Sequence, residues 1–272
     1  MISLDYGLVF SLLLLGCVVG FIAGLLGVGG GGIMVPVLAS LFLAYGMGSE
    51  KVMHFALGTS MASIIVTSFS SVRAHQSKNG VMWKVVQYMA PGMLCGAFFV
   101  TFVVSILKSM YLAIFFSFFM AYVAIQLFLN LKPKSDRTLP GKACLFTAGA
   151  GIGGISSLVS IGGGSLTVPY LSWHNVKMTS AIGTSAALGV PISLAGTAGY
   201  IINGWGNASR DGMTFGYIYV PAVLLISSVS FFTAPLGARL AHKLSVPKLK
   251  KIFGLVLFAL SIKMLISVVN GG

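Results

Sequence analysis

The stretch that decides the fold reads Gly27-Val28-Gly29-Gly30-Gly31-Gly32-Ile33-Met34-Val35-Pro36, and apolar sequence flanks it on both sides. Five of its first six residues are glycine, which costs a helix about 1 kcal/mol per residue relative to alanine. Pro36 then removes a backbone hydrogen-bond donor. The stretch therefore predicts a break between helices.

The same break occurs a second time, 133 residues further along the chain. It reads Ser160-Ile161-Gly162-Gly163-Gly164-Ser165-Leu166-Thr167-Val168-Pro169. Gly24–Leu38 aligns with Ser157–Leu171 without a gap, and seven of the fifteen paired residues are identical. Bare backbone inside a hydrophobic protein has to be buried by protein or line a wet cavity. Two copies of the break therefore point to a common structural or functional purpose.

The composition is that of a membrane protein. The chain is 57% hydrophobic and 8% charged, with a mean hydropathy of +0.98, far above the range of soluble domains. Its four carboxylates are Asp5, Glu50, Asp136 and Asp211. Apolar stretches of the roughly 20 residues that cross a bilayer fill nearly its whole length. We therefore predict an all-α polytopic membrane protein.

The polar and sulfur-containing residues do not form a cofactor site. The net charge of +13 concentrates in a few short loops, which indicates membrane topology rather than a site for nucleic acid or another polyanion. Cys17, Cys95 and Cys144 fall in apolar segments without a CxxC motif, and we predict buried packing residues. We expect no metal and no cofactor.

The apolar segments recur in the same order in two halves of the chain. Each half carries a break and then a Gly-Thr-Ser triplet, at residues 58–60 and 183–185. We expect about 8–10 membrane segments, including two glycine-broken helices that are either re-entrant or discontinuous. The halves are residues 1–131 and 143–272, and a basic linker at 132–142 joins them. The expected segments are Leu4–Leu26, Ile33–Tyr45, Val52–Val72, Trp83–Ile106, Tyr111–Leu131, Ala143–Val159, Leu166–Trp173, Thr179–Ile202, Phe215–Leu240 and Ile252–Val269.

The basic loops predict that the two repeats have opposite orientation. Thirteen of the 17 lysines and arginines lie in the loops at 73–84, 132–142, 173–178 and 239–251, which we assign to the cytoplasm. Loop 73–84 then lies inside while its counterpart in the second half lies outside. The sequence therefore predicts inverted-topology repeats, the plan of many secondary transporters, with both termini outside.

Inverted repeats would bring the two breaks together, where their bare amides suit an anion. The amides precede helices expected to begin at Ile33 and Leu166, and a helix N-terminus favours negative charge. Arg73 and His75 are candidates for a gating or charge contact, although a topological arginine and a histidine at the membrane surface are the plainer interpretations. The expected substrate-binding residues are Gly29, Gly30, Gly31, Gly32, Thr59, Ser60, Gly162, Gly163, Gly164, Ser165, Thr184 and Ser185.

Plainer explanations compete with this site. Tight packing of membrane helices explains Gly16, Gly20 and Gly24, which form a small-xxx-small face, but it does not explain the two prolines. Serine and threonine in membrane helices often bond to their own i−4 carbonyl, so substrate contact by the triplet hydroxyls stays open. The chain has no Gly-Lys-Ser/Thr phosphate loop and no G-x-S-x-G elbow, and we expect no enzyme activity.

The same residues carry a family resemblance that covers essentially the whole chain. They are Gly29-Gly30-Gly31 to Pro36-Val37-Leu38, Gly162-Gly163-Gly164 to Pro169-Tyr170-Leu171, both Gly-Thr-Ser triplets, and Arg73-Ala74-His75 ahead of Gly80-Val81-Met82-Trp83. With these motifs the chain resembles the sulfite exporter TauE/SafE family, also called the 4-toluene sulfonate uptake permease family. The resemblance implies a permease for sulfite, organosulfonates or related sulfur-containing or carboxylate anions, in a bacterial-type inner membrane.

Three functions follow as hypotheses. The first is a secondary transporter that moves a small anion across the lipid bilayer by alternating access. The second is an anion channel whose filter consists of two re-entrant glycine segments. The third is an assembly or sensor protein without transport, which predicts a closed and dry centre. Whether the protein forms a homodimer is left open.

The glycines of the breaks provide a direct test. Replacing Gly30 or Gly163 by leucine should abolish anion binding without unfolding the protein, because the side chain would cover the bare amides. Binding of radiolabelled sulfite to the purified variants measures this, and intact binding would refute the site.

Overall fold

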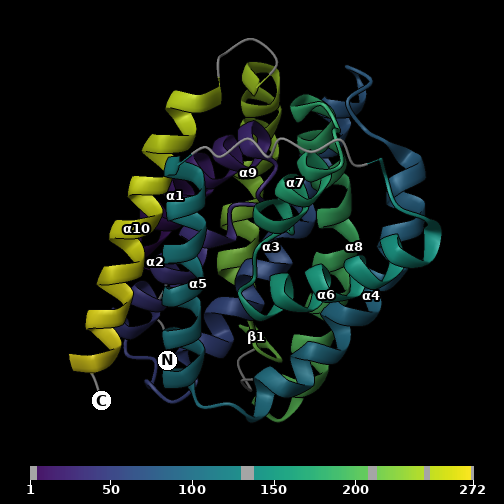
Figure 1. The fold of residues 1–272 in the computed structure, drawn as a ribbon. Helices are drawn as coiled ribbons and strands as arrows, with labels where there is room; N and C mark the ends of the chain where they lie inside the picture. The colour runs from purple at the N-terminus through teal and green to yellow at the C-terminus, as the bar shows by residue number, and fades with distance from the viewer. Residues whose placement is uncertain (1–4, 130–137, 208–212, 242–245, 271–272) are drawn as a thin grey trace.

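The computed structural model describes residues 5–129, 138–207, 213–241 and 246–270 and is almost entirely helical (Figure 1). A short 3-10 helix, Trp205–Asn207, and a two-stranded antiparallel hairpin, β1 (Thr214–Phe215) and β2 (Ile218–Tyr219), precede α9. The helices are α1 (Tyr6–Leu26), α2 (Gly31–Ala44), α3 (Val52–Gln76), α4 (Trp83–Ile106), α5 (Ser109–Leu129), α6 (Lys142–Leu158), α7 (Gly164–Trp173), α8 (Met178–Gly204), α9 (Val220–Ala241) and α10 (Val246–Asn270).

Six of these helices are long and apolar enough to cross a bilayer, namely α1, α3, α4, α5, α8 and α9. α2 and residues Phe253–Met264 of α10 are shorter apolar helices. Large apolar side chains such as Phe10, Phe99 and Phe232 point outward and are exposed, as a lipid-facing surface requires. The prediction of an all-α membrane protein is confirmed to this extent. Most of the predicted linker, residues 132–137, lies outside the described residues.

After the first glycine break, α2 ends near the start of α1. Asp5 caps α1 by accepting from the amide of Leu8 at 2.8 Å, and its carboxylate also accepts from the hydroxyl of Tyr45, just beyond α2, at 3.0 Å. This hydrogen bond raises the pKa of Tyr45 above its usual value. α2 therefore returns to the end of the bundle where α1 begins. α10 also ends there (Figure 1), and we call it the termini end.

The main helix packings are the same when the two halves are exchanged. α1 packs along α9. When each of these two helices is replaced by the helix five places away in chain order, the pair becomes α6 and α4, and these two helices also pack along each other. Two further contacts join a helix directly to its own counterpart in the other half. These are the contact of α3 with α8 at the centre and the contact of α5 with α10 at the periphery. In Figure 1, α5 and α10 lie on one side of the bundle, and α4 and α6 lie on the other.

Glycines allow these helix pairs to approach closely. A Cβ atom on Gly16 would lie 2.6 Å from the carbonyl oxygen of Ile226, and Gly20 and Gly24 face α9 in the same way. The predicted small-xxx-small face of α1 is therefore confirmed. Gly149 and Gly153 of α6 perform the same role against α4.

The prediction that the cysteines are buried is wrong. Cys17, Cys95 and Cys144 are all exposed, on the outward faces of α1, α4 and α6. A lipid-facing surface is apolar, so a hydrophobic sequence context does not distinguish it from the protein interior.

The contact between α6 and α4 predicts the result of two matched substitutions. A Cβ atom on Gly153 would lie 2.6 Å from the Cα of Met93, whereas one on Gly151 would meet nothing within 4 Å. Gly153→Leu should destabilise the protein by about 1–3 kcal/mol through overpacking. Gly151→Leu should not, because it points outward from the same helix. Thermal unfolding of the purified variants in detergent compares them, and equal midpoints would contradict the packing.

Candidate functional site

The two glycine breaks cross at the centre of the bundle with their backbones in contact. A Cβ atom on Gly29 would lie 2.6 Å from the Cα of Gly162, and one on Gly162 would lie 2.9 Å from the Cα of Gly29. Gly31 faces the carbonyl of Ser160, and Gly164 faces the carbonyl of Gly27. The predicted convergence of the breaks is confirmed, and it depends on the absence of side chains.

Left-handed backbone conformations form both turns. Gly27, Gly29 and Gly30 have φ values of 68°, 75° and 77°, and Gly163 has 79°. Ser160 adopts φ 47° although it is not glycine, and its hydroxyl donates to the carbonyl of Leu57 at 2.7 Å. Such a conformation is strained for a side-chain-bearing residue and needs local support, which this hydrogen bond supplies.

The helices after the breaks begin two residues earlier than predicted. α2 begins at Gly31 and α7 at Gly164, where the sequence predicted Ile33 and Leu166. The last two residues of each break, Gly31-Gly32 and Gly164-Ser165, therefore belong to the first helical turn. Glycine disfavours a helix only weakly there, because the first-turn amides have no intrahelical partner in any case.

The two Gly-Thr-Ser triplets fasten each half to the other. The hydroxyl of Ser60 donates to the carbonyl of Ser160 at 3.4 Å, and that of Ser185 donates to the carbonyl of Gly27 at 3.1 Å. Ser160 and Gly27 occupy equivalent positions in the two breaks. Each serine therefore satisfies the carbonyl at which a helix of the opposite half ends.

The threonines of the triplets also connect the two halves. The hydroxyl of Thr59 accepts from the amide of Tyr219 at 3.0 Å, and that of Thr184 accepts from the amide of Met82 at 3.0 Å. Both amides lie at the start of a helix in the other half. All four triplet hydroxyls are buried and occupied by the backbone in this conformation. Their contact with substrate stays a prediction.

His75 and Arg73 lie close in sequence but have different surroundings. His75 is fully buried, and its Nε2 lies 3.0 Å from the carbonyl of Gly24 in the last turn of α1. His54 is also buried, with Nε2 3.1 Å from the carbonyl of Val104. The expectation of a histidine at the membrane surface is wrong for His75, because its side chain is buried at a helix junction. Arg73 is exposed in the last turn of α3.

A cavity of about 600 Å³ reaches the second break. It is bounded by α5, α7, the start of α8 and the first break, and its lining includes Leu26, Val28, Gln126, Gly164, Ser165 and Trp173. Because Leu129, at the end of α5, and Trp173, at the end of α7, also line it, the cavity lies towards the end opposite the termini end. We call it the α5–α7 cavity.

Two of the hydroxyls that line this cavity, those of Ser165 and Ser172, are buried without a hydrogen-bond partner among the described residues, and Ser165 is the one that belongs to the second break. Its side chain is 6% exposed, and its hydroxyl has no hydrogen-bond partner among the described residues. A buried hydroxyl without a partner is costly, so a polar ligand at this position would be favoured. The equivalent residue of the first break, Gly32, is instead covered by Met120 of α5 and Leu257 of α10. Gly32 is therefore covered, whereas Ser165 lines the α5–α7 cavity, which Val28 of the first break also lines.

Sequence reasoning missed the contribution of α5. Tyr122 and Gln126 line the α5–α7 cavity, but they lie in an apolar segment without any motif. The described residues contain no group of three or more histidine, cysteine or acidic side chains that could hold a metal ion.

Comparisons with known proteins agree with this architecture. The family described as "Sulfite exporter TauE/SafE" matches residues 12–264. A probable membrane transporter protein of Haemophilus influenzae is 37% identical over 254 residues, which cover 93% of this chain and 96% of that protein. One from Methanocaldococcus jannaschii is 25% identical over 263 residues, 94% of each chain. No solved structure matches the chain significantly.

The crossing predicts different costs for two glycines with similar backbones. Gly29 has φ 75° and touches Gly162, whereas Gly46 has φ 86° and a Cβ there would meet nothing within 4 Å. Gly46→Ala should cost about 1 kcal/mol through backbone strain alone. Gly29→Ala should lower the unfolding midpoint in detergent much further, because it also separates the two breaks. If the two variants unfold alike, the backbone contact at the crossing is not a source of stability.

Proposed function

The chain belongs to the sulfite exporter TauE/SafE family, and on this premise we propose that it is a secondary transporter for small anions. The proposed substrates are sulfite, organosulfonates or related sulfur-containing or carboxylate anions. Family membership and the apolar helices make it a multi-pass membrane transporter. The substrate, alternating access across an inner membrane, and the site at the breaks are our proposal.

The observation that carries the proposal is the unpartnered hydroxyl of Ser165 beside the first turn of α7. The first amides of a helix have no intrahelical acceptor, and the helix dipole adds positive potential there. An oxyanion in the α5–α7 cavity would accept from these amides and from the serine. The lining of the cavity is otherwise largely apolar, which accommodates the organic part of a sulfonate or carboxylate.

The exchange symmetry of the packing supports inverted repeats. Equivalent helices of the two halves make equivalent contacts, and the basic loops of the two halves are biased towards opposite positions in the repeat. Both features are consistent with two copies of one unit inserted in opposite directions. Lys142, at the start of α6, lies 5.1 Å from the ring centre of Tyr88 near the start of α4. This contact places the start of α6 beside the start of α4, which carries Lys84. The proposal therefore places the end opposite the termini end in the cytoplasm and both termini outside.

A transporter fits better than the channel alternative. The α5–α7 cavity reaches the second break, while Met120 and Leu257 cover Gly32 of the first break. Access from one side at a time is the requirement of alternating access, whereas a channel filter needs a path through both segments.

Counterflow in proteoliposomes tests the transport itself. Vesicles containing the purified protein and loaded with unlabelled sulfite, sulfoacetate or succinate should accumulate the matching radiolabelled anion. Repeating the assay with a pH or Na⁺ gradient identifies the coupling ion. Absence of counterflow for all three anions, with protein-free vesicles as the control, would contradict the proposed function.

A milder substitution than leucine at the glycines tests the site. Gly30 and Gly163 have positive φ values, so leucine there would also strain the backbone. Ser165→Ala should raise the KM for the transported anion about ten-fold, the effect of losing a hydrogen bond to a charged group. Ser117→Ala is the matched control, because its hydroxyl is buried and unpartnered but does not line the α5–α7 cavity. Equal KM values for the two variants would remove Ser165 from the site.

A further inference from the structure

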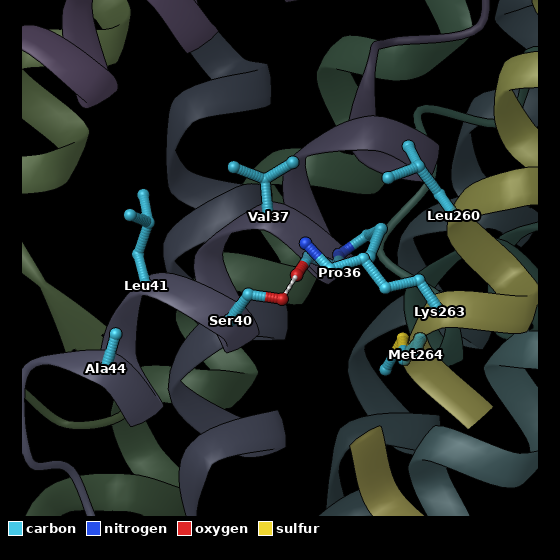
Figure 2. A pocket seen from close by; sticks show the side chains of 8 residues that line it. All are labelled: Pro36, Val37, Ser40, Leu41, Ala44, Leu260, Lys263 and Met264. Atoms are coloured by element: carbon cyan, nitrogen blue, oxygen red, sulfur yellow. Dashed lines mark hydrogen bonds between the residues drawn. The ribbon is translucent and has the colours of Figure 1, made fainter. Parts of the chain in front are cut away.

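A second, smaller pocket of about 340 Å³ lies between α2 and α10. Figure 2 shows its lining, with Lys263 extending from α10 towards Pro36 on α2. Ala44, the last residue of α2, also lines it, so the pocket lies near the termini end. We call it the α2–α10 pocket.

The α2–α10 pocket corresponds to part of the α5–α7 cavity. Pro36 and Pro169 occupy equivalent positions of the two breaks and line one space each. α10 begins 137 residues after α5, and with this offset three more lining positions coincide. These pairs are Leu260 with Val123, Lys263 with Gln126, and Met264 with Leu127.

The burial of the two helices supports this alignment. Phe116 and Phe253, which the same offset pairs, are both buried, and so are Met120 and Leu257. The side chains of Met120 and Leu257 lie over Gly32 of the first break. Gly32 does not line the α2–α10 pocket, whereas the equivalent residue Ser165 lines the α5–α7 cavity.

The two spaces differ in charge. Lys263 is the one charged residue among the residues that line them, and Gln126 holds the equivalent position in the α5–α7 cavity. Lys263 is exposed, and the remaining lining of its pocket is almost entirely apolar. An ammonium group at the mouth of an apolar pocket attracts an anion and raises its local concentration.

We propose that the α2–α10 pocket is a second anion-binding site, in which Lys263 receives the anionic substrate at the termini end before it reaches the first glycine break. This inference rests on the proposed transport function. It makes the two faces of the transporter unequal, because the residue that replaces the lysine at the opposite face is neutral. The ligand is a soluble sulfonate, sulfite or carboxylate rather than a lipid headgroup.

The test measures transport from each face separately. Membrane vesicles of both orientations are prepared, and a C-terminal tag accessible to antibody reports which face is outward. Initial rates of radiolabelled sulfite and sulfoacetate uptake then give a KM for each face. Lys263→Gln should raise the KM about two- to five-fold at the termini end, as expected for loss of an exposed charge pair, and leave it unchanged at the other.

Three matched variants sharpen the test. Lys263→Arg should retain the wild-type KM at both faces because it keeps the charge. Gln126→Lys should lower the KM about two- to five-fold at the end opposite the termini end, because it places an equivalent charge in the α5–α7 cavity. Lys108→Gln removes a lysine outside both spaces and should change neither KM. Unchanged elution and unfolding midpoints verify that each variant is folded.

Each contrary result has a distinct meaning. Equal effects of Lys263→Gln at both faces, or none at either, would overturn the inference while leaving transport intact. A lipid headgroup is tested by measuring wild-type protein in vesicles of phosphatidylcholine alone. If its KM at the termini end rises as much as Lys263→Gln raises it in anionic lipid, Lys263 binds a lipid headgroup, and the inference is also overturned. If wild-type vesicles carry neither sulfite nor sulfoacetate, the proposed function fails for these anions, and the inference fails with it.

Discussion

The contact of two bare backbone segments at Gly29 and Gly162 constrains the rest of the structure. A side chain at either position would push the breaks apart, and neighbouring contacts of Gly31 and Gly164 are equally close. The contact also explains why the glycines occur twice. Each break supplies the flat surface against which the other packs, so neither half can form the centre of the protein without its counterpart.

Because the breaks are irregular, they leave backbone groups that an apolar interior cannot solvate. The serines of the two triplets satisfy the carbonyls of Ser160 and Gly27, and each comes from the half that does not contain its acceptor. The carbonyl side of each break is thus completed by protein. The first-turn amides of α2 and α7 need acceptors rather than donors. In the first turn of α7 the neighbouring side chain is Ser165, whose hydroxyl has no hydrogen-bond partner among the described residues. This difference between the two sides of a break favours a site for an anion over a purely structural crossing.

Sequence reasoning predicts the features that follow from local composition. The helical class, the two breaks, their convergence and the glycine face of α1 all derive from residues whose chemistry restricts them wherever they occur. It fails where the partner decides the role. His75 resembles a surface histidine in sequence, yet it is buried because α1 ends beside it, and Cys17 resembles a core residue although it faces outward. Gln126 carries no local signal, since only the tertiary arrangement of α5 and α7 around a common space makes it a lining residue of the α5–α7 cavity.

Two of the departures from the exchange symmetry adjoin the cavities. Contacts that hold the halves together are duplicated almost atom for atom, as the paired bonds of Thr59 and Thr184 illustrate. Two of the residue pairs that differ, Ser165 against Gly32 and Gln126 against Lys263, belong to the two spaces or to the first break. Alternating access presents a site to one face at a time. Under the proposed function, the different side chains in the two approaches would therefore give the substrate different affinities at the two faces.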